Sequence, residues 1–94
     1  MGQLHQKPCN IPETVTATAL GARVILFNDD MHTFEEVTGQ LARALSCPAD
    51  EAFRLAYLAH TNGSAVVFAG PVDQCLGVSS VLEEIHLLTR IECE

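Results

Sequence analysis

The chain has 94 residues, of which 48% are hydrophobic and 18% charged, and its formal net charge at pH 7 is −7. This hydrophobic content is too high for a disordered acidic segment, and it suffices for one domain with a modest core. Because only five residues are Lys or Arg, the composition disfavours binding to nucleic acid or to an anionic membrane surface, both of which require cationic side chains.

The first part of the chain, residues 1–18, shows no hydrophobic periodicity and contains Pro8 and Pro12. We expect a flexible N-terminal tail over residues 1–18 and a single domain over residues 19–94. The tail lacks the basic and apolar regions of a signal peptide, and no apolar run in the chain is long enough to span a bilayer. We therefore expect a cytoplasmic protein with no membrane partner.

An apolar run predicts a first strand over Gly21–Phe27. Ala22, Val24 and Leu26 would share one face of this strand. Only Arg23 is charged on the opposite face, so we expect the strand to be central and covered on at least part of both faces.

A first helix is predicted from the sequence Thr33-Phe34-Glu35-Glu36 to about Leu45. These four residues match a capping box, in which the Thr33 hydroxyl accepts from the Glu36 amide and the Glu36 side chain reaches back. The apolar stripe of this helix has helical spacing. It comprises Phe34, Val37, Leu41 and Leu45.

A second helix begins near Pro48, where Asp50 and Glu51 favour the positive end of the helix dipole, and runs to about Thr61. Asn62-Gly63 ends it, because both residues tolerate a left-handed conformation. The helix is apolar nearly all round, so we expect it to be deeply packed.

The rest of the chain predicts a strand over Ser64–Ala69, a third helix from Gly70-Pro71 to about Leu87, and a short edge strand over Thr89–Glu94. The third helix would be built on five apolar residues: Val72, Leu76, Val81, Leu82 and Ile85. The order β-α-α-β-α-β predicts a single two-layer α/β (α+β) domain, in which a three-stranded sheet packs on helices.

Four cysteines are spread along the chain without a C-x-x-C pair, at Cys9, Cys47, Cys75 and Cys93. Metal knuckles and disulfide frameworks require closer or patterned spacing. We therefore expect four free thiols in a reducing compartment.

The polar sequence Asn28-Asp29-Asp30 separates the first strand from the first helix. It could be an Asx-type turn, a metal site or a site for a cationic group, because all three side chains carry oxygen acceptors. His60, near the end of the second helix, could be a surface residue or could border a hollow beside the small residues Ala56 and Ala59.

Catalytic readings find little support in the sequence. Cys47 and His60 could form a nucleophilic pair, but no oxyanion-hole loop accompanies them. Asp29, Asp30, His32 and His60 are suitable metal ligands by type, yet no metal-binding spacing supports them. We expect no enzyme, no metal and no cofactor.

Three segments together resemble the ClpS adaptor family of the bacterial N-end rule pathway: Val24–Asp30, Thr33–Val37 and Ala59–Val66. The resemblance is clear from Val24 to Val67 and looser to Cys93. It implies an adaptor that captures proteins through a destabilising N-terminal residue (an N-degron), namely Leu, Phe, Tyr or Trp. The adaptor then hands them to a AAA+ unfoldase, ClpA or ClpC, for proteolysis. The same fold is expected, and we expect a monomer.

The resemblance also implies roles for individual residues. Asn28, Asp30 and His60 would contact the free α-amino group, with Asp29 supporting the loop. The pocket for the N-terminal side chain would be lined by Phe34, Val37, Ala56 and Ala59. Asp73 could take the place of an acid that docks the unfoldase, but Val78 stands where the family usually has a lysine.

Two alternatives remain open from the sequence. One is a protein-interaction module of the same shape with altered or lost N-degron or unfoldase binding, similar to the C-terminal domain of the ribosomal stalk protein. The poverty in lysine, with only Lys7 in the tail, argues against the stalk-like version. The other alternative is a small metal-dependent enzyme.

Overall fold

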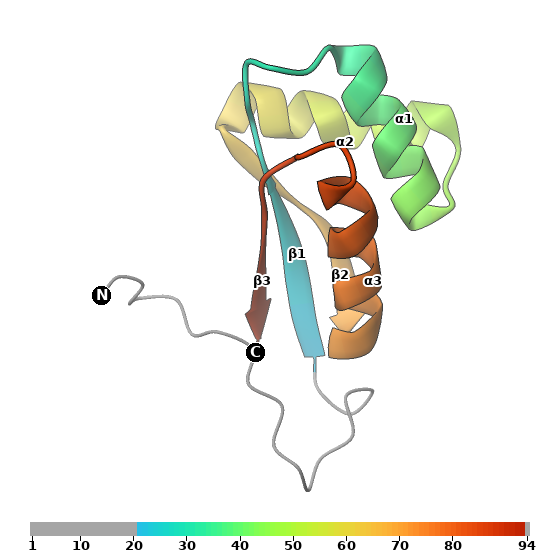
Figure 1. The fold of residues 1–94 in the computed structure, drawn as a ribbon, viewed down its shortest axis with the longest axis vertical. Helices are drawn as coiled ribbons and strands as arrows, with labels where there is room; N and C mark the ends of the chain where they lie inside the picture. Colours follow the sequence, from blue (N-terminus) through green and yellow to red (C-terminus); the bar gives the residue numbers. More distant parts are fainter. Residues whose placement is uncertain (1–20, 94) are drawn as a thin grey trace, which may run out of the picture.

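The computed structural model describes residues 21–93, and the predicted tail at 1–18 lies outside the described residues. The order of elements is the predicted one, β-α-α-β-α-β (Figure 1). The elements are β1 (Gly21–Phe27), α1 (Phe34–Leu45), α2 (Ala49–Asn62), β2 (Ser64–Pro71), α3 (Val72–Glu83) and β3 (Thr89–Cys93).

The three strands form an antiparallel sheet in the order β2-β1-β3, so β1 is central, as predicted. Ala22, Val24 and Leu26 point from β1 into the core and are almost fully buried. The opposite face of β1 is more open than expected, since Arg23 is exposed and Phe27 is only half-buried. The Arg90 guanidinium lies 5.1 Å from the centre of the Phe27 ring and covers part of it.

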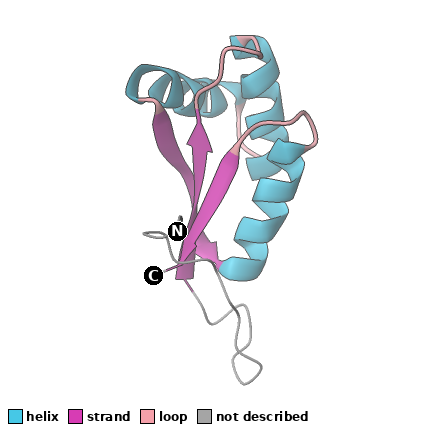
Figure 2. Ribbon diagram, turned by 60° about the vertical axis from the view of Figure 1, so that its left-hand side comes forward, coloured by secondary structure: helices cyan, strands magenta, loops and turns pink. Residues whose placement is uncertain are grey.

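The helices form the second layer. Helix α3 runs along the sheet, α2 crosses near one end of the strands, and α1 packs against α2 and α3 (Figures 1 and 2). The largest fully buried side chains come from the sheet, α1 and α3: Val24, Leu26, Leu41, Val72, Cys75 and Leu82. No helix in residues 21–93 is long and apolar enough to cross a membrane.

Helix α3 is shorter than predicted. It ends at Glu83 rather than near Leu87, because His86 adopts a left-handed conformation with φ 66°. The His86 amide donates to the Glu83 carbonyl at 2.9 Å and the Leu87 amide to the Leu82 carbonyl at 3.4 Å. This pair of bonds is the Schellman arrangement, and the buried side chains of Leu82 and Leu87 supply the apolar contact that accompanies it.

Helix α2 is less buried than predicted. Ala52, Leu55, Ala56 and Ala59 pack inward, but Phe53 and Tyr57 are 50% and 53% exposed. The apolar composition of α2 therefore does not mean that the helix is buried all round, because its aromatic residues lie on an outward face. The expectation for α3 was also wrong at Leu76, which is 49% exposed.

The cysteines do not share one state. Cys47 and Cys75 are free thiols, as expected, and Cys75 is fully buried. Burial raises the pKa of the Cys75 thiol above its ordinary value. Cys93 is disulfide-bonded, so the expectation of a free thiol was wrong for this residue. Cys9 lies outside the described residues.

Candidate functional site

A cavity of about 310 Å³ opens where β1 ends, between the loop that follows it and helices α1 and α2. Polar side chains of the loop and apolar side chains of α1 and α2 face the same cavity. It is lined by Leu26, Phe27, Asn28, Asp29, Asp30, His32, Thr33, Phe34, Val37, Ala56, Ala59, His60 and Leu87. All eight residues expected at the α-amino and side-chain sites are among them, although they come from three separate segments.

Two backbone hydrogen bonds hold the loop after β1 in place. The Phe27 amide donates to the Leu88 carbonyl at 3.0 Å, and the Asn28 amide donates to the Gly63 carbonyl at 3.0 Å. Gly63 ends α2 with φ 87°, a conformation that glycine adopts at little cost. The loop is therefore fixed against the end of α2, on which His60 lies.

Asp29 organises the loop internally. Its Oδ1 atom accepts from the Met31 amide at 3.0 Å and from the His32 amide at 3.1 Å, which is the Asx-type turn considered from the sequence. Burial by itself would raise the pKa of Asp29. Hydrogen bonds from the His32 ring and from these two amides outweigh it, and the pKa lies below its ordinary value of 3.8.

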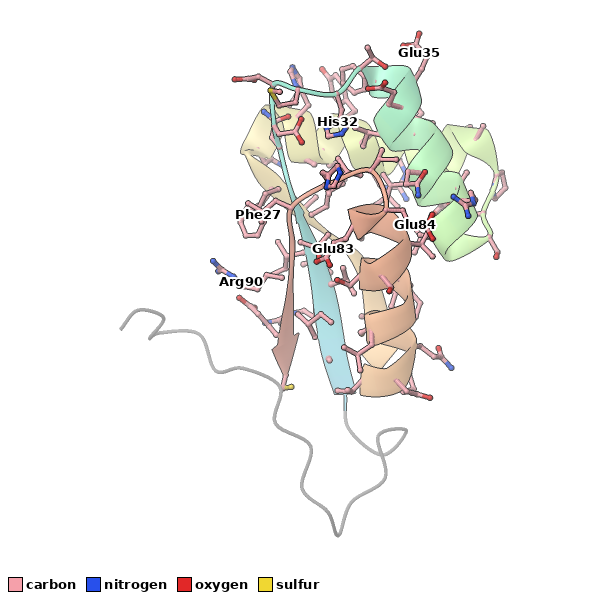
Figure 3. All side chains as sticks on the ribbon, viewed as in Figure 1. Phe27, His32, Glu35, Glu83, Glu84 and Arg90 are labelled. Carbon is pink, nitrogen blue, oxygen red and sulfur yellow. The ribbon has the colours of Figure 1, made fainter. Side chains whose placement is uncertain are left out.

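The ring of His32 joins this loop to the end of α3. Its Nδ1 atom lies 2.9 Å from Asp29 Oδ2, and its Nε2 atom lies 2.6 Å from the Ile85 carbonyl oxygen. The hydrogen bond to Asp29 is the main reason that the pKa of His32 is raised above 6.5; the Ile85 carbonyl and the charges of Asp29 and Glu36 add to it, against the opposing effect of burial. In Figure 3, His32 lies above the end of α3 that carries Glu83 and Glu84.

Asn28, Asp30 and His60 differ from Asp29 and His32, because their side chains make no hydrogen bond to any other residue in the described part of the chain. All three are exposed and line the cavity. An amide oxygen, a carboxylate and a neutral imidazole nitrogen can each accept a hydrogen bond. Together they can receive a group with several N–H donors, such as a primary ammonium.

The apolar part of the cavity is formed by α1 and α2. Phe34 and Val37 come from the first turn of α1 and are half-buried, whereas Ala56 and Ala59 of α2 are each 3% exposed. The two alanines leave space that larger side chains would fill. The Phe34 ring lies edge-on to the His60 ring, with centroids 5.2 Å apart, so the apolar and polar parts of the site are continuous.

Phe34 also belongs to an aromatic group on the outer surface of α2. Its ring centroid lies 5.5 Å from that of Phe53 and 6.4 Å from that of Tyr57. Such distances suit aromatic packing. These contacts hold the Phe34 ring at the mouth of the cavity.

Sequence reasoning missed several lining residues. The apolar pattern predicts Leu87 inside a longer helix and Leu26 in the core only. By residue type His32 is a possible metal ligand, yet no group of three or more His, Cys, Asp or Glu side chains that could hold a metal ion occurs within residues 21–93. Nothing in its sequence position indicated a contact with Ile85, which lies 53 residues later.

The fold and this cavity define a small ligand-binding domain with a polar mouth and an apolar floor. Residues 20–87 match the family model described as "ATP-dependent Clp protease adaptor protein ClpS". The chain belongs to the ClpS family, whose members are adaptors rather than enzymes. This membership replaces the ribosomal-stalk-like module and the metal-dependent enzyme that the sequence left open.

Individual relatives of the chain support the assignment to the ClpS family. The ClpS adapter protein of Synechocystis sp. is 34% identical over 68 residues, covering 71% of this chain and 69% of the relative. That of Thermosynechococcus vestitus is 36% identical over 53 residues, covering 55% and 56%. The structure of Agrobacterium tumefaciens ClpS2 bound to L-phenylalaninamide superposes with a TM-score of 0.74 at 27% identity, covering 80% of this chain and 98% of that one. The fold is thus that of ClpS.

Proposed function

We propose that the cavity binds the N-terminal residue of substrate proteins. Asn28, Asp30 and His60, three acceptors without a side-chain hydrogen bond within residues 21–93, would receive its free α-amino group. The observation that carries this proposal is the position of those acceptors at the mouth of an apolar cavity. An α-ammonium has three N–H donors and a positive charge, which match three acceptors of which one is a carboxylate. Asp29 supports the loop, because its own oxygens are already occupied.

The N-terminal side chain enters the apolar part of the cavity, between Phe34 and Val37 on one side and Ala56 and Ala59 on the other. The volume of about 310 Å³ and the two small alanines suit bulky residues, namely Leu, Phe, Tyr or Trp. L-Phenylalaninamide, bound by the Agrobacterium protein, has this chemistry: a free α-amine beside a benzyl group.

The interactions suffice for capture and release. A charge-assisted hydrogen bond contributes about 1.5–3 kcal/mol, and burial of a Leu- or Phe-sized side chain contributes about 1.5–3 kcal/mol. Two or three such polar contacts with one apolar anchor give roughly 5–10 kcal/mol before ordering costs. A micromolar affinity corresponds to about 8 kcal/mol, which lies within this range.

The partner that receives the substrate is the AAA+ unfoldase of a Clp protease, ClpA or ClpC, in the cytoplasm, and the adaptor acts as a monomer. Asp73 is exposed in the first turn of α3 and can contact the unfoldase. Val78 is buried at 7% exposure, so its position offers no charge to a partner. Docking on α3 therefore relies on Asp73 without a nearby cation from this position.

The test compares two peptides that differ only at the amino group. A labelled peptide that begins with a free Phe should bind in fluorescence anisotropy at micromolar concentration, and its N-acetylated form should not, because acetylation removes the charge and two of the three donors. A peptide with a free N-terminal Ser serves as the control for the apolar pocket. Equal binding of the free and acetylated Phe peptides would refute the proposal.

A further inference from the structure

The His32 ring is held at both of its nitrogen atoms. The Nδ1 atom faces the Asp29 carboxylate at 2.9 and 3.1 Å, and the Nε2 atom faces the Ile85 carbonyl at 2.6 Å. Carboxylate and carbonyl oxygens accept hydrogen bonds and cannot donate them. A neutral imidazole has one N–H and can satisfy only one of these contacts, whereas an imidazolium has two. The geometry therefore assigns His32 as a cation.

Ile85 is a favourable partner for that cation. It lies in the turn that ends α3, where His86 reverses the chain in a left-handed conformation. The amides of this turn satisfy the Leu82 and Glu83 carbonyls, and the Ile85 carbonyl accepts from His32. The C-terminal end of a helix carries partial negative charge, which favours a protonated histidine. The His32 side chain is only 15% exposed, so water competes weakly for these bonds.

This contact fixes the loop that carries the acceptors. Asp29 and His32 belong to the loop of residues 28–33, and Ile85 belongs to the segment between α3 and β3. The end of α3 is joined to α1, since the Gln40 side-chain amide donates to the Val81 carbonyl at 2.6 Å. Glu84, just after α3, accepts from the Gln40 amide at 3.3 Å and pairs with Arg43 at 2.8 Å. The ring of His32 thus joins the loop that carries Asn28 and Asp30 to the end of α3.

We propose that His32 is a positioning residue for substrate binding, whose protonated ring joins the acceptor loop to the end of α3 through both nitrogen atoms, so that substrate affinity falls when the ring loses its proton. This inference rests on the proposed function. It concerns a residue that does not itself need to touch the substrate.

The charged groups around His32 support a proton on its ring. Asp29 lies in its own loop and Glu36 in the first turn of α1, and both raise its pKa. At the end of α3, Glu83 accepts from Ser79 at 3.3 Å and from Thr89 at 2.8 Å, and Glu84, just after the helix, is paired with Arg43. Three further titratable groups flank the site: Asp30 in the loop, His60 on α2 and His86 beside Ile85.

The direct test is NMR titration of the histidine rings in the full chain without substrate. Ring nitrogen shifts should show that His32 is doubly protonated at neutral pH, with a midpoint above 6.5, and the backbone amides of residues 28–33 should shift with the same midpoint. A His32 ring that is neutral at pH 7, or loop amides that do not follow it, would overturn the inference. This measurement stands whether or not peptides bind.

The second test measures the affinity for a free Phe peptide from pH 6.5 to 9 as a ratio to the affinity of His32→Arg, a cation at every accessible pH with several N–H donors. This ratio cancels the deprotonation of the peptide's own α-amino group, whose ordinary pKa is about 7.7–8.0. The wild-type ratio should fall at the His32 midpoint. The His32→Gln ratio should be at least about tenfold lower than the wild-type ratio at pH 6.5, equivalent to about 1.4 kcal/mol, and should not fall further toward pH 9.

The matched control is His86→Asn. It removes an exposed ring next to Ile85 and keeps a residue that tolerates the left-handed conformation, so its pH profile should equal that of the wild type. A wild-type ratio that stays flat to pH 9, or a His32→Gln ratio that falls as the wild-type ratio does, would contradict the inference. If the wild type binds no peptide at any pH, the proposed function fails, and the ring titration alone decides the role of His32.

Discussion

The backbone amide of Asn28 donates to the carbonyl of Gly63 at 3.0 Å, joining the loop after β1 to the end of α2. This single bond connects residues that are far apart in the sequence and brings Asn28 near His60, three residues before Gly63. The acceptors of the binding site therefore meet because a strand end and a helix end are pinned together. Their side chains remain available, since the pinning uses only backbone groups.

Removal of a single acceptor should weaken substrate binding. Asp30→Asn keeps the size of the side chain but removes the charge, and we expect a loss of about 1.5–3 kcal/mol, the contribution of a charged hydrogen bond. Fluorescence anisotropy with a free Phe peptide measures this loss of binding free energy. Asp50→Asn, an exposed change in the first turn of α2, is the control and should leave affinity unchanged. Unaltered binding by Asp30→Asn would exclude Asp30 as an acceptor.

The small residues on α2 should set the size of the side chain that the pocket admits. Ala56→Leu fills part of the cavity, so we expect binding of Trp and Phe peptides to fall by about 1–3 kcal/mol, the usual cost of overpacking, with a smaller effect on Leu peptides. A peptide panel that differs only at residue one measures the change in ranking. Ala44→Leu, a half-buried site away from the cavity, is the control. A uniform loss for all peptides would show that Ala56 does not select by size.

The bond between Asp29 and His32 should stabilise the fold within a defined pH window. Because the pKa of Asp29 is lowered on folding, this residue adds to the free energy of unfolding above pH 3.8, and the addition is lost as the pH falls through the pKa of the folded protein. Because the pKa of His32 is raised on folding, its addition to the free energy of unfolding is complete below pH 6.5 and is lost as the pH rises through the pKa of the folded protein. Urea unfolding should therefore show the largest difference between the wild type and His32→Gln from pH 4 to 6.5. A difference that does not vary with pH would show that charge plays no part.

The capping box of α1 should contribute to stability without being part of the site's acceptor set. The Thr33 hydroxyl accepts from the Glu36 amide at 3.1 Å, and Glu36 accepts from the Thr33 amide at 2.9 Å. Thr33→Ala should lower the free energy of unfolding by about 1 kcal/mol, measured by urea denaturation. Thr33→Ser keeps the cap and should lose little. Equal losses in both variants would point to the methyl group rather than the hydroxyl.

Docking to the unfoldase should depend on the exposed face of α3. Asp73→Lys reverses a charge that lies far from the cavity lining, so it should weaken binding to ClpA or ClpC and leave peptide affinity unchanged. Gel filtration or anisotropy with the purified unfoldase measures unfoldase binding, and anisotropy with a free Phe peptide measures peptide affinity. Unfoldase binding that survives this change would place the docking surface elsewhere.

Local sequence patterns determined the elements and their order. The alternating burial of β1, the capping box at Thr33 and the glycine after α2 each act over a few residues, so they can be read without knowledge of the fold. The eight expected site residues also came from the sequence, because Asn28-Asp29-Asp30 and the His60 region match a known family. Their meeting in one cavity required the sheet and helices to be assembled.

Tertiary structure decided what each polar residue does. Asp29 and Asp30 are adjacent and chemically identical. Asp29 accepts from His32 and two amides, whereas the Asp30 side chain makes no hydrogen bond within the described part of the chain. The reason is spatial. Helix α3 ends earlier than its apolar pattern predicts, and the turn after it presents the Ile85 carbonyl to His32. The other nitrogen of the His32 ring contacts Asp29. A contact across 53 residues is set by the packing of layers, which no local pattern encodes.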